Sequence, residues 1–210
     1  MASHANPPNA AVDFNGTSIA AFDGVYAPRE DSLLLASAVE KFASGSFLDL
    51  GCGTGIQGIA ASRSPRVSSV VFADVNPVAV ANAQFNASAF RIAKPNSFLQ
   101  SGLFSGLGAE KFGTIAFNPP YLPTAGNEKV AGPLNSAFDG GKSGRKTTGR
   151  FLRQFPSHLN ADGIMLLADS SLARYEKSVR FLESRGYSVE KVGSQRFFFE
   201  EIVVLKAARK

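Results

Sequence analysis

Three glycines between a short apolar run and a helix constrain this chain more than any other feature. The run Phe47–Leu50 reads as a buried strand, residues 51–55 spell Gly-Cys-Gly-Thr-Gly, and a helix is predicted to begin near Ile56. Glycine lets bare backbone approach a ligand closely, and the start of a helix adds partial positive charge. The spacing is G-x-G-x-G rather than the G-x-G-x-x-G of dinucleotide-binding loops. The loop indicates a ligand site, with a plain strand-to-helix turn as the alternative.

A carboxylate after the next strand strengthens this interpretation. Residues 70–73 read as a second buried strand, and Asp74 follows them directly. An acidic side chain about twenty residues beyond a glycine loop can accept hydrogen bonds from both hydroxyls of a ribose. The alternative is a solvent-exposed aspartate with no ligand. Loop and carboxylate together predict a cofactor that contains a nucleoside.

Apolar runs and helical patterns alternate along the rest of the chain, which predicts an α/β fold. Helices are predicted to begin near Leu33 and Pro77, and another to span residues 172–184 before Gly186. Further strands are predicted at residues 97–99, 114–117 and 164–167, and two closing extended segments at 187–192 and 198–205. Continuous apolar strands between helices are typical of a parallel sheet covered on both faces. The closing pair indicates an antiparallel edge, to which we assign Phe197, Phe198 and Phe199.

Length and composition fit one domain and exclude several classes of protein. The chain has 210 residues, of which 44% are hydrophobic. Residues 1–20 are rich in Ala, Asn, Pro and Ser, so we expect a flexible tail there and the domain at residues 21–210. No segment approaches the ~20 apolar residues of a membrane span, and we find no signal peptide, so a cytoplasmic location is expected. The single cysteine, Cys52, and the lack of a Cys/His cluster predict neither a disulfide nor a bound metal.

A second site follows the predicted strand at 114–117, where the sequence reads Asn118-Pro119-Pro120-Tyr121. Proline fixes the backbone, so the carbonyl of Pro119 is free to accept a hydrogen bond. The side-chain oxygen of Asn118 is another acceptor, and Tyr121 offers an aromatic face. Two acceptors that converge on an –NH2 group above a ring would hold a planar amide or an amino-purine nitrogen. The alternative is a proline turn that ends a strand.

The two sites together resemble the class I S-adenosylmethionine-dependent methyltransferases of the N/D-P-P-Y/F/W branch, which methylate planar nitrogens. A closer resemblance comes from residues 25–35, Val-Tyr-Ala-Pro-Arg-Glu-Asp-Ser-Leu-Leu-Leu. They look like the V-Y-x-P-x-E-D-[ST]-x-L-L segment of the HemK2/Mtq2 group of release-factor glutamine methyltransferases. Residues 139–144, Asp-Gly-Gly-Lys-Ser-Gly, and the closing segment 198–205 are also similar to that group.

The resemblance implies a Rossmann-like fold with a seven-stranded, mostly parallel sheet and an antiparallel edge. It also implies roles for single residues. Asp49 would meet the amino group of the methionine moiety, Ser32 its carboxylate, and Asp74 the ribose. Asn118 would touch both cofactor and substrate, with Pro119, Pro120 and Tyr121 also binding the substrate and Pro119 and Tyr121 taking part in catalysis. The remaining cofactor contacts would come from Tyr26, Gly51, Gly53, Gly55 and Leu103.

The activity implied by the resemblance is methyl transfer from S-adenosylmethionine to the glutamine side chain of the Gly-Gly-Gln motif of a class 1 peptide-release factor. Members of the group commonly work with a small zinc-binding Trm112-like activator. One position departs from the family pattern: the acidic residue that usually meets the adenine amino group is replaced by Gly102. That contact is therefore either missing or supplied by Ser101 or a backbone group.

Two other functions remain open at this point. An adenine-N6 methyltransferase acting on RNA or DNA would use the same Asn-Pro-Pro-Tyr motif. It gains some support from a run of cations that is free of acidic residues, made of Lys142, Arg145, Lys146, Arg150 and Arg153. That run would otherwise be a solvated surface. A non-catalytic scaffold that has lost cofactor binding would explain Gly102.

Overall fold

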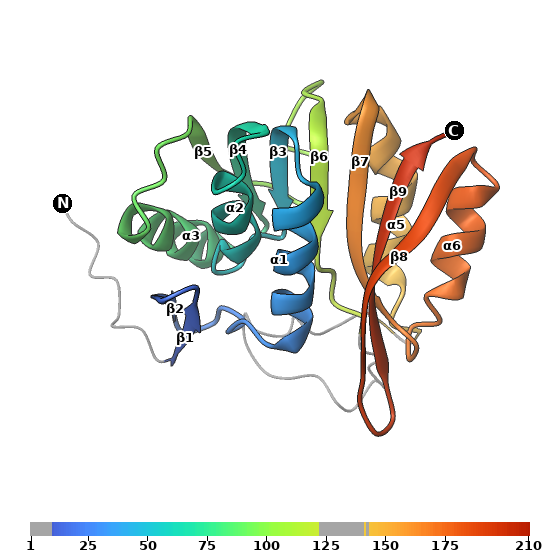
Figure 1. The fold of residues 1–210 in the computed structure, drawn as a ribbon, viewed down its shortest axis with the longest axis horizontal. Helices are drawn as coiled ribbons and strands as arrows, with labels where there is room; N and C mark the ends of the chain where they lie inside the picture. The colour runs from blue at the N-terminus through green and yellow to red at the C-terminus, as the bar shows by residue number, and fades with distance from the viewer. Residues whose placement is uncertain (1–9, 122–140, 142) are drawn as a thin grey trace.

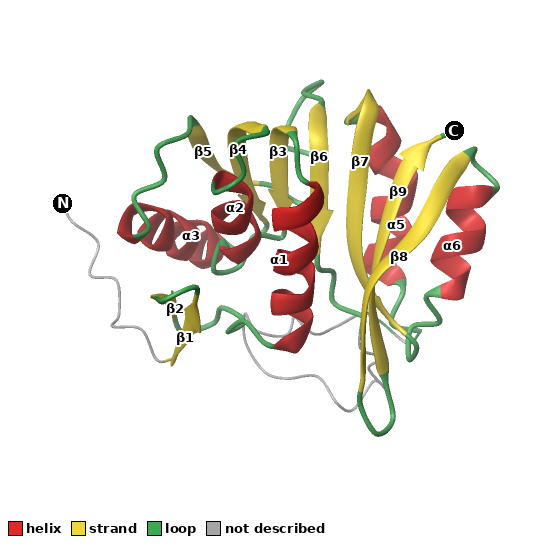
Figure 2. Cartoon of the chain, in the orientation of Figure 1, coloured by secondary structure: helices red, strands yellow, loops and turns green. Residues whose placement is uncertain are grey.

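The computed structural model describes residues 10–121, 141 and 143–210, which form a central seven-stranded sheet flanked by helices (Figures 1 and 2). The strands lie in the order β5-β4-β3-β6-β7-β9-β8. Their bounds are β3 (Gly45–Leu50), β4 (Val67–Asp74), β5 (Asn96–Gln100), β6 (Phe112–Phe117), β7 (Leu159–Ser170), β8 (Tyr187–Arg196) and β9 (Glu201–Arg209). The pairs from β5 to β7 are parallel, whereas β9 is antiparallel to both β7 and β8. The predicted fold class and antiparallel edge are confirmed.

Helices cover both faces of the sheet. They are α1 (Glu30–Phe42), α2 (Ile56–Ser62), α3 (Pro77–Ala89), α5 (Lys146–Gln154) and α6 (Glu176–Glu183), with a 3₁₀ turn, η1 (Phe155–Ser157). Helices α1, α2 and α3 lie on one face and α5 and α6 on the other (Figure 1). Side chains of β4 alternate between two hydrophobic cores: Val70 and Phe72 join the first helix layer, and Val71 and Ala73 the second. This period of two explains why a continuous apolar run folds as a strand buried on both faces.

Residues 10–20, which we expected to belong to a flexible tail, form a separate two-stranded hairpin together with Ala21. Strands β1 (Ala10–Phe14) and β2 (Thr17–Ala21) pair antiparallel, and Ile19 is fully buried. Two buried asparagines of α3 hold the hairpin. Asn86 Oδ1 accepts from the backbone N–H of Ala20 at 3.0 Å, and Asn82 Nδ2 donates to the carbonyl of Ala20 at 3.0 Å. These hydrogen bonds join residues that are 66 and 62 positions apart in the sequence, so the local composition of the tail does not predict them.

Two further expectations about the carboxyl-terminal region are wrong. The helix predicted at residues 172–184 begins only at Glu176, because Arg174 has a φ of 57°, which an α-helix does not contain. The Phe197–Phe199 segment forms no part of the strand pair: it lies in the turn between β8 and β9, where Phe198 is 92% exposed. Among the described residues, no helix has the length and apolar character that crossing a membrane requires.

The order of the strands indicates where the sheet binds a ligand. From β3 the chain proceeds to β4 and β5 on one side, then returns to β6 on the other. A crevice opens beyond the carboxyl ends of the strands where the winding direction changes, and α/β proteins bind their ligands there. Leu50 and Phe117, the last residues of β3 and β6, are register partners at this point.

Candidate active site

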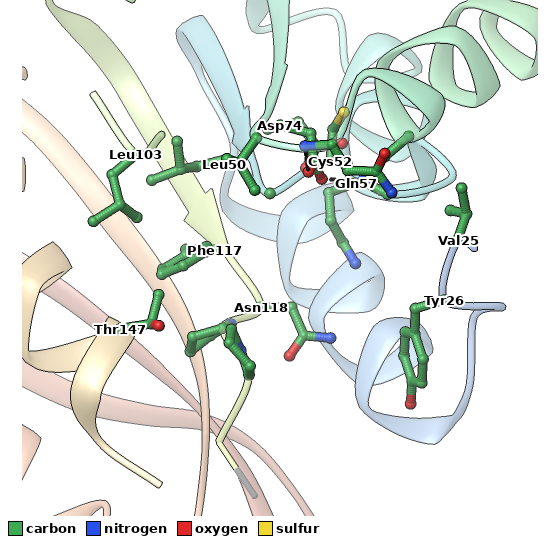
Figure 3. Close-up of a pocket in the computed structure, with 18 of the residues that line it drawn as sticks. Val25, Tyr26, Leu50, Cys52, Gln57, Asp74, Leu103, Phe117, Asn118 and Thr147 are labelled. Carbon is green, nitrogen blue, oxygen red and sulfur yellow. Dashed lines mark hydrogen bonds between the residues drawn. The ribbon is translucent and has the colours of Figure 1, made fainter. Parts of the chain in front are cut away.

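A pocket of about 640 Å³ lies at this crevice, between the glycine loop, the start of α1 and the end of β6 (Figure 3). Gly51, Gly53 and Gly55 have φ values of 64°, 53° and 83°, in the left-handed region that favours glycine. A Cβ atom on Gly51 would lie 3.1 Å from Cε2 of Phe117, so the loop packs directly against the end of β6. At Gly51 and Gly53 the loop therefore presents bare backbone to the pocket, which Cys52 and Thr54 also line.

Most of the site residues predicted from the sequence line this one pocket. They are Tyr26, Ser32, Asp49, Gly51, Gly53, Asp74, Leu103, Asn118, Pro119, Pro120 and Tyr121. Gly55 is absent from the lining. It is the N-cap of α2, and a Cβ there would lie 3.1 Å from Cα of Ala83, so close packing against α3 accounts for that glycine. The glycine loop and the Asn-Pro-Pro-Tyr segment thus share a single cavity.

Two aspartates hold the backbone of the loop and of the helix that follows it. Asp74 accepts from the backbone N–H of Gly53 at 3.0 Å and from that of Asn76 at 2.9 Å. Asp49, only 1% exposed, accepts from the N–H of Gly58 at 2.9 Å. Burial raises the pKa of Asp49 to about 8, and burial also raises the pKa of Asp74. Burial therefore disfavours the ionised form of both carboxyls, and a cation or hydroxyl donor beside them would favour it.

Asp31 also lines the pocket, and the sequence analysis assigned it no role of its own. Its side chain is almost completely buried, and its two oxygens receive five hydrogen bonds. Oδ1 accepts from the Tyr26 hydroxyl at 3.3 Å and from the backbone N–H and hydroxyl of Ser32 at 2.6 and 3.1 Å. Oδ2 accepts from Nδ2 of Asn118 at 3.0 Å and from the Tyr121 hydroxyl at 3.1 Å. Burial and the nearby Asp31 raise the pKa of both tyrosines, which therefore stay protonated as donors.

Two buried acceptors in the pocket have no hydrogen-bond partner among the described residues. They are Oδ1 of Asn118 and Oε1 of Gln57. Gln57 donates through Nε2 to the carbonyl of Ser32 at 3.0 Å, so its free oxygen is fixed in place. A buried acceptor without a partner is costly, and such atoms are satisfied when a ligand with N–H or O–H groups binds. Phe117 is a further lining residue that the sequence patterns did not indicate.

The predicted basic run divides between two environments. Lys146 and Arg150 line the pocket from α5. Arg145 instead donates to Ser178 and to the carbonyl of Ala173 at 2.9 Å each, and pairs with the fully buried Asp169 at 3.7 Å. Lys142, Asp139 and Gly140 lie outside the described residues. The run is therefore not one uniform surface for a polyanion.

Cys52 and His158 have structural surroundings. Cys52 lies in the loop, is buried, and burial raises the pKa of its thiol far above the ordinary value, so it is not a ready nucleophile. His158 stacks on Phe104 with ring centroids 4.5 Å apart, and its Nδ1 lies 2.9 Å from the carbonyl of Glu110. Cys52 lines the pocket as a buried thiol within the glycine loop, whereas His158 is not among the lining residues.

Comparison with known proteins decides the family. The family model described as the methyltransferase small domain matches residues 18–198. The chain belongs to this family. MJ0928 of Methanocaldococcus jannaschii, whose name assigns it to the protein N5-glutamine methyltransferases, is 36% identical over 198 residues, covering 94% of this chain and 98% of the relative. Human methyltransferase HEMK2 is 29% identical over 207 residues, covering 94% and 96% of the two chains.

Solved structures support the fold of this small-domain methyltransferase. A chain of the E. cuniculi Mtq2–Trm112 complex, described as methylating the termination factor eRF1, aligns with a TM-score of 0.68. It is 23% identical, and the match covers 89% of this chain and 99% of that chain. This structure supports the fold, and the identities to MJ0928 and HEMK2 over most of both chains confirm the resemblance to the HemK2/Mtq2 group.

Membership of the family implies that S-adenosylmethionine supplies the methyl group. The residues present fit such a cofactor. The glycines of the loop offer bare backbone, two carboxyls stand at the ends of β3 and β4, and Leu103 and Phe117 add apolar surface. Leu103 has a φ of 58°, a conformation uncommon for a branched side chain and often associated with functional sites.

Proposed function

We propose that this chain methylates the side-chain amide nitrogen of a glutamine, in the Gly-Gly-Gln motif of a class 1 peptide-release factor. The observation that carries the proposal is the free oxygen of Asn118. It is buried in the pocket, lacks a partner among the described residues, and belongs to the Asn-Pro-Pro-Tyr segment. An acceptor held in this way suits an –NH2 group, which must donate two hydrogen bonds when it is buried. The name of the relative MJ0928 supports the same chemistry.

For the cofactor, we assign the two carboxyls to opposite parts of the molecule. Asp49 would hold the amino group of the methionine moiety, with Ser32 near its carboxylate. Asp74 would hold the ribose hydroxyls, since each of its oxygens has a lone pair beyond those used by Gly53 and Asn76. Gly51 and Gly53 would let the backbone approach the ligand, and Tyr26 and Leu103 would close the sides of the pocket.

The chemistry depends on positioning. An amide nitrogen is a weak nucleophile because its lone pair is delocalised into the carbonyl group. When bound, S-adenosylmethionine supplies an electrophilic methyl group. The chain's own part is to hold both amide hydrogens, one on Oδ1 of Asn118 and one on the carbonyl of Pro119, and thereby to set the direction of the lone pair. Orientation alone is worth several kcal/mol, about 7–11 in favourable cases.

Burial around the Asn-Pro-Pro-Tyr segment adds to this effect. Pro119 is buried, and Tyr121 is fixed by its hydrogen bond to Asp31 at 3.1 Å. These groups keep water away from the target nitrogen. A site with little water favours a reaction in which the positive charge on the sulfur disappears. No metal ion or covalent intermediate is part of the proposed reaction.

A small activator of the Trm112 type is part of the proposal. The structural neighbour Mtq2 was solved as a complex with Trm112. We propose that a protein of the same kind binds this chain. The activator is expected to raise the rate of methyl transfer.

The test is a methylation assay with defined acceptors. The purified protein, with and without a Trm112-like partner, is incubated with labelled S-adenosylmethionine and a class 1 release factor. Mass spectrometry should find one added methyl group on the glutamine of Gly-Gly-Gln, and none when that glutamine is replaced by asparagine. Absence of label under all these conditions would overturn the proposed substrate.

A second candidate is an adenine-N6 methyltransferase acting on RNA or DNA. The specific observation in its favour is that Lys146 and Arg150 line the pocket, where they could meet phosphates. The same assay with RNA and DNA in place of the release factor separates the two. Label in nucleic acid alone would favour this candidate, whereas failure to bind S-adenosylmethionine in a titration would favour a non-catalytic scaffold.

A further inference from the structure

We infer that Asp31 is the positioning residue that fixes which way the Asn118 amide faces, a role that rests on the proposed function. Asn118 is useful to an –NH2 substrate only when its oxygen, rather than its nitrogen, is presented. An asparagine amide can rotate by half a turn and exchange these two atoms at little cost. Something in the protein must therefore select one orientation.

The carboxylate of Asp31 makes that selection. An ionised carboxylate only accepts hydrogen bonds, so the group that faces it must be the amide nitrogen. Nδ2 of Asn118 lies 3.0 Å from Oδ2 of Asp31, which leaves Oδ1 of Asn118 without a partner among the described residues.

Asp31 is itself held in one orientation. Three donors converge on Oδ1: the backbone N–H of Ser32, its hydroxyl, and the hydroxyl of Tyr26. The same carboxylate also anchors the Tyr121 hydroxyl through Oδ2. Both ends of the Asn-Pro-Pro-Tyr segment are therefore oriented by a residue that lies 87 and 90 positions earlier in the chain.

Exchange of Asp31 for asparagine tests this directly. The three donors on Oδ1 require an acceptor, so the new amide must place its oxygen there and its –NH2 group toward Asn118. Two –NH2 groups then face one another, and Asn118 relieves the conflict by turning its own nitrogen into the pocket. Asp31→Asn is therefore expected to lower the single-turnover rate at saturating cofactor by about 10²-fold, as loss of a positioned group commonly does.

The reciprocal exchange should restore activity. In Asp31→Asn/Asn118→Asp, the amide at position 31 donates to a carboxylate at position 118, whose second oxygen again faces the pocket as an acceptor. The double variant has the same number of charges and nearly the same shape as the parent. We expect it to recover to within about tenfold of the parental rate. Asn118→Asp alone places two carboxylates about 3 Å apart and should stay slow at neutral pH.

A folding check, a control variant and an NMR measurement complete the test. Thermal denaturation checks that each variant folds, and Asp162→Asn, at an exposed position of β7, serves as a matched control with parental activity. The third follows the side-chain amide protons of Asn118 by NMR with ¹⁵N-asparagine; their signals are assigned by their loss in Asn118→Asp. These protons should move upfield in Asp31→Asn, and this readout needs no methyl acceptor, so it stands even if the proposed substrate is wrong.

The outcomes divide cleanly. A slow Asp31→Asn, a recovered double variant and shifted amide protons support the inference. A folded Asp31→Asn with a near-parental rate overturns it, as does a folded double variant that is no faster than Asp31→Asn. If the parent methylates another –NH2 acceptor instead of glutamine, the same rate comparison on that acceptor tests the role of Asp31.

Discussion

Oδ2 of Asp31 lies 3.0 Å from Nδ2 of Asn118, and this contact joins the first turn of α1 to the end of β6. Asp31 comes from the segment that carries the closest family resemblance, and Asn118 from the segment expected to hold the substrate. The two motifs are thus hydrogen-bonded to each other and line the same pocket. Changes in either should therefore affect methyl transfer more than they affect the fold.

The first prediction concerns Asn118. Asn118→Ala removes the free acceptor, and Pro119 alone would hold only one amide hydrogen, so the single-turnover rate should fall by about 10²-fold or more. Titration calorimetry should show at most a modest loss of cofactor affinity. A variant that methylates at a near-parental rate with saturating cofactor would mean that the motif is structural.

The second prediction concerns Asp74. Its carboxylate also braces the loop through Gly53 and Asn76, so alanine would disturb both ligand and loop. Asp74→Asn keeps one acceptor oxygen and is the cleaner variant. A lost charge-assisted hydrogen bond costs ~1.5–3 kcal/mol, so cofactor affinity should fall by about tenfold or more. An unchanged dissociation constant in calorimetry would refute the ribose assignment.

The third prediction restores the acidic residue that the family usually has at Gly102. A Cβ there would meet only the Ser105 hydroxyl oxygen, at 3.6 Å, so a side chain fits. Ser101 replaces the missing acid at most in part, since its hydroxyl already donates to the carbonyl of Leu103 at 2.6 Å and accepts from the N–H of Gly106 at 2.9 Å. Because the position is exposed, Gly102→Asp should raise cofactor affinity by only about fivefold.

Gly102→Asn is the matched control for that experiment. It has nearly the same shape without the charge, and its gain in affinity should be smaller. Equal affinities for the parent and both variants would show that the adenine amino group does not lie beside this position.

The fourth prediction concerns pH. The pKa of Asp49 is raised to about 8, so this group is mostly protonated at pH 7 in the free protein. An ammonium group beside it favours the carboxylate, so cofactor binding should release a proton, and affinity should rise as the pH increases toward 8. Calorimetry in buffers of different ionisation enthalpy counts that proton. Asp49→Asn should bind more weakly and release none at this site; equal proton release by both proteins would contradict the assignment.

The raised pKa of Asp49 also affects folding. The pKa of this carboxyl rises from its ordinary value of 3.8 to about 8 in the folded chain. Between about pH 4 and pH 8, therefore, the folded chain holds a proton that the unfolded chain has lost. Burial of Asp49 therefore lowers the free energy of unfolding as the pH rises through this window.

The fifth prediction concerns stability. A Cβ on Gly58 would lie 2.1 Å from Cε1 of Phe72, inside the core beneath α2. Gly58→Ala should lower the free energy of unfolding by about 1–3 kcal/mol. Gly149→Ala is the control, because its Cβ would meet only Arg153, at 3.7 Å, within α5. It should be neutral or stabilise by about 0.5–1 kcal/mol in urea titrations.

Much of the sheet could be predicted because its strands are encoded locally. Apolar runs such as Phe47–Leu50 and residues 114–117 lie within β3 and β6, and the glycine loop follows β3 as expected. The asparagines of α3 show what local patterns omit. Asn82 and Asn86 stand four positions apart on an alanine-rich helix, a spacing that places both on one face, and this was the available signal for a docked segment.

The site could be predicted only in part for the same reason. Glycine loops and proline motifs are readable because their function depends on the backbone. The hydrogen bonds that join Asp31 to the second motif reach residues far away in the chain, such as Tyr121, 90 positions later, so no local pattern indicates them. The exposure of Phe198 and Phe199 was likewise not predictable, because an aromatic run beside β9 reads as a strand whether or not it turns away from the sheet.

The docking of the amino-terminal hairpin has a consequence for how the protein is made. The segment that leads to Tyr26 is held by contacts 60 and 66 positions apart, from Asn82 to Phe22 and from Asn86 to Ala20. Contacts of long sequence separation form late because loop closure must precede them. On the ribosome, therefore, the segment that leads to Tyr26 cannot dock until α3 has emerged. The hydrogen bonds of Asp31 cannot all form until Tyr121 has emerged. The cofactor site would therefore be complete only after at least the first 121 of the 210 residues have emerged.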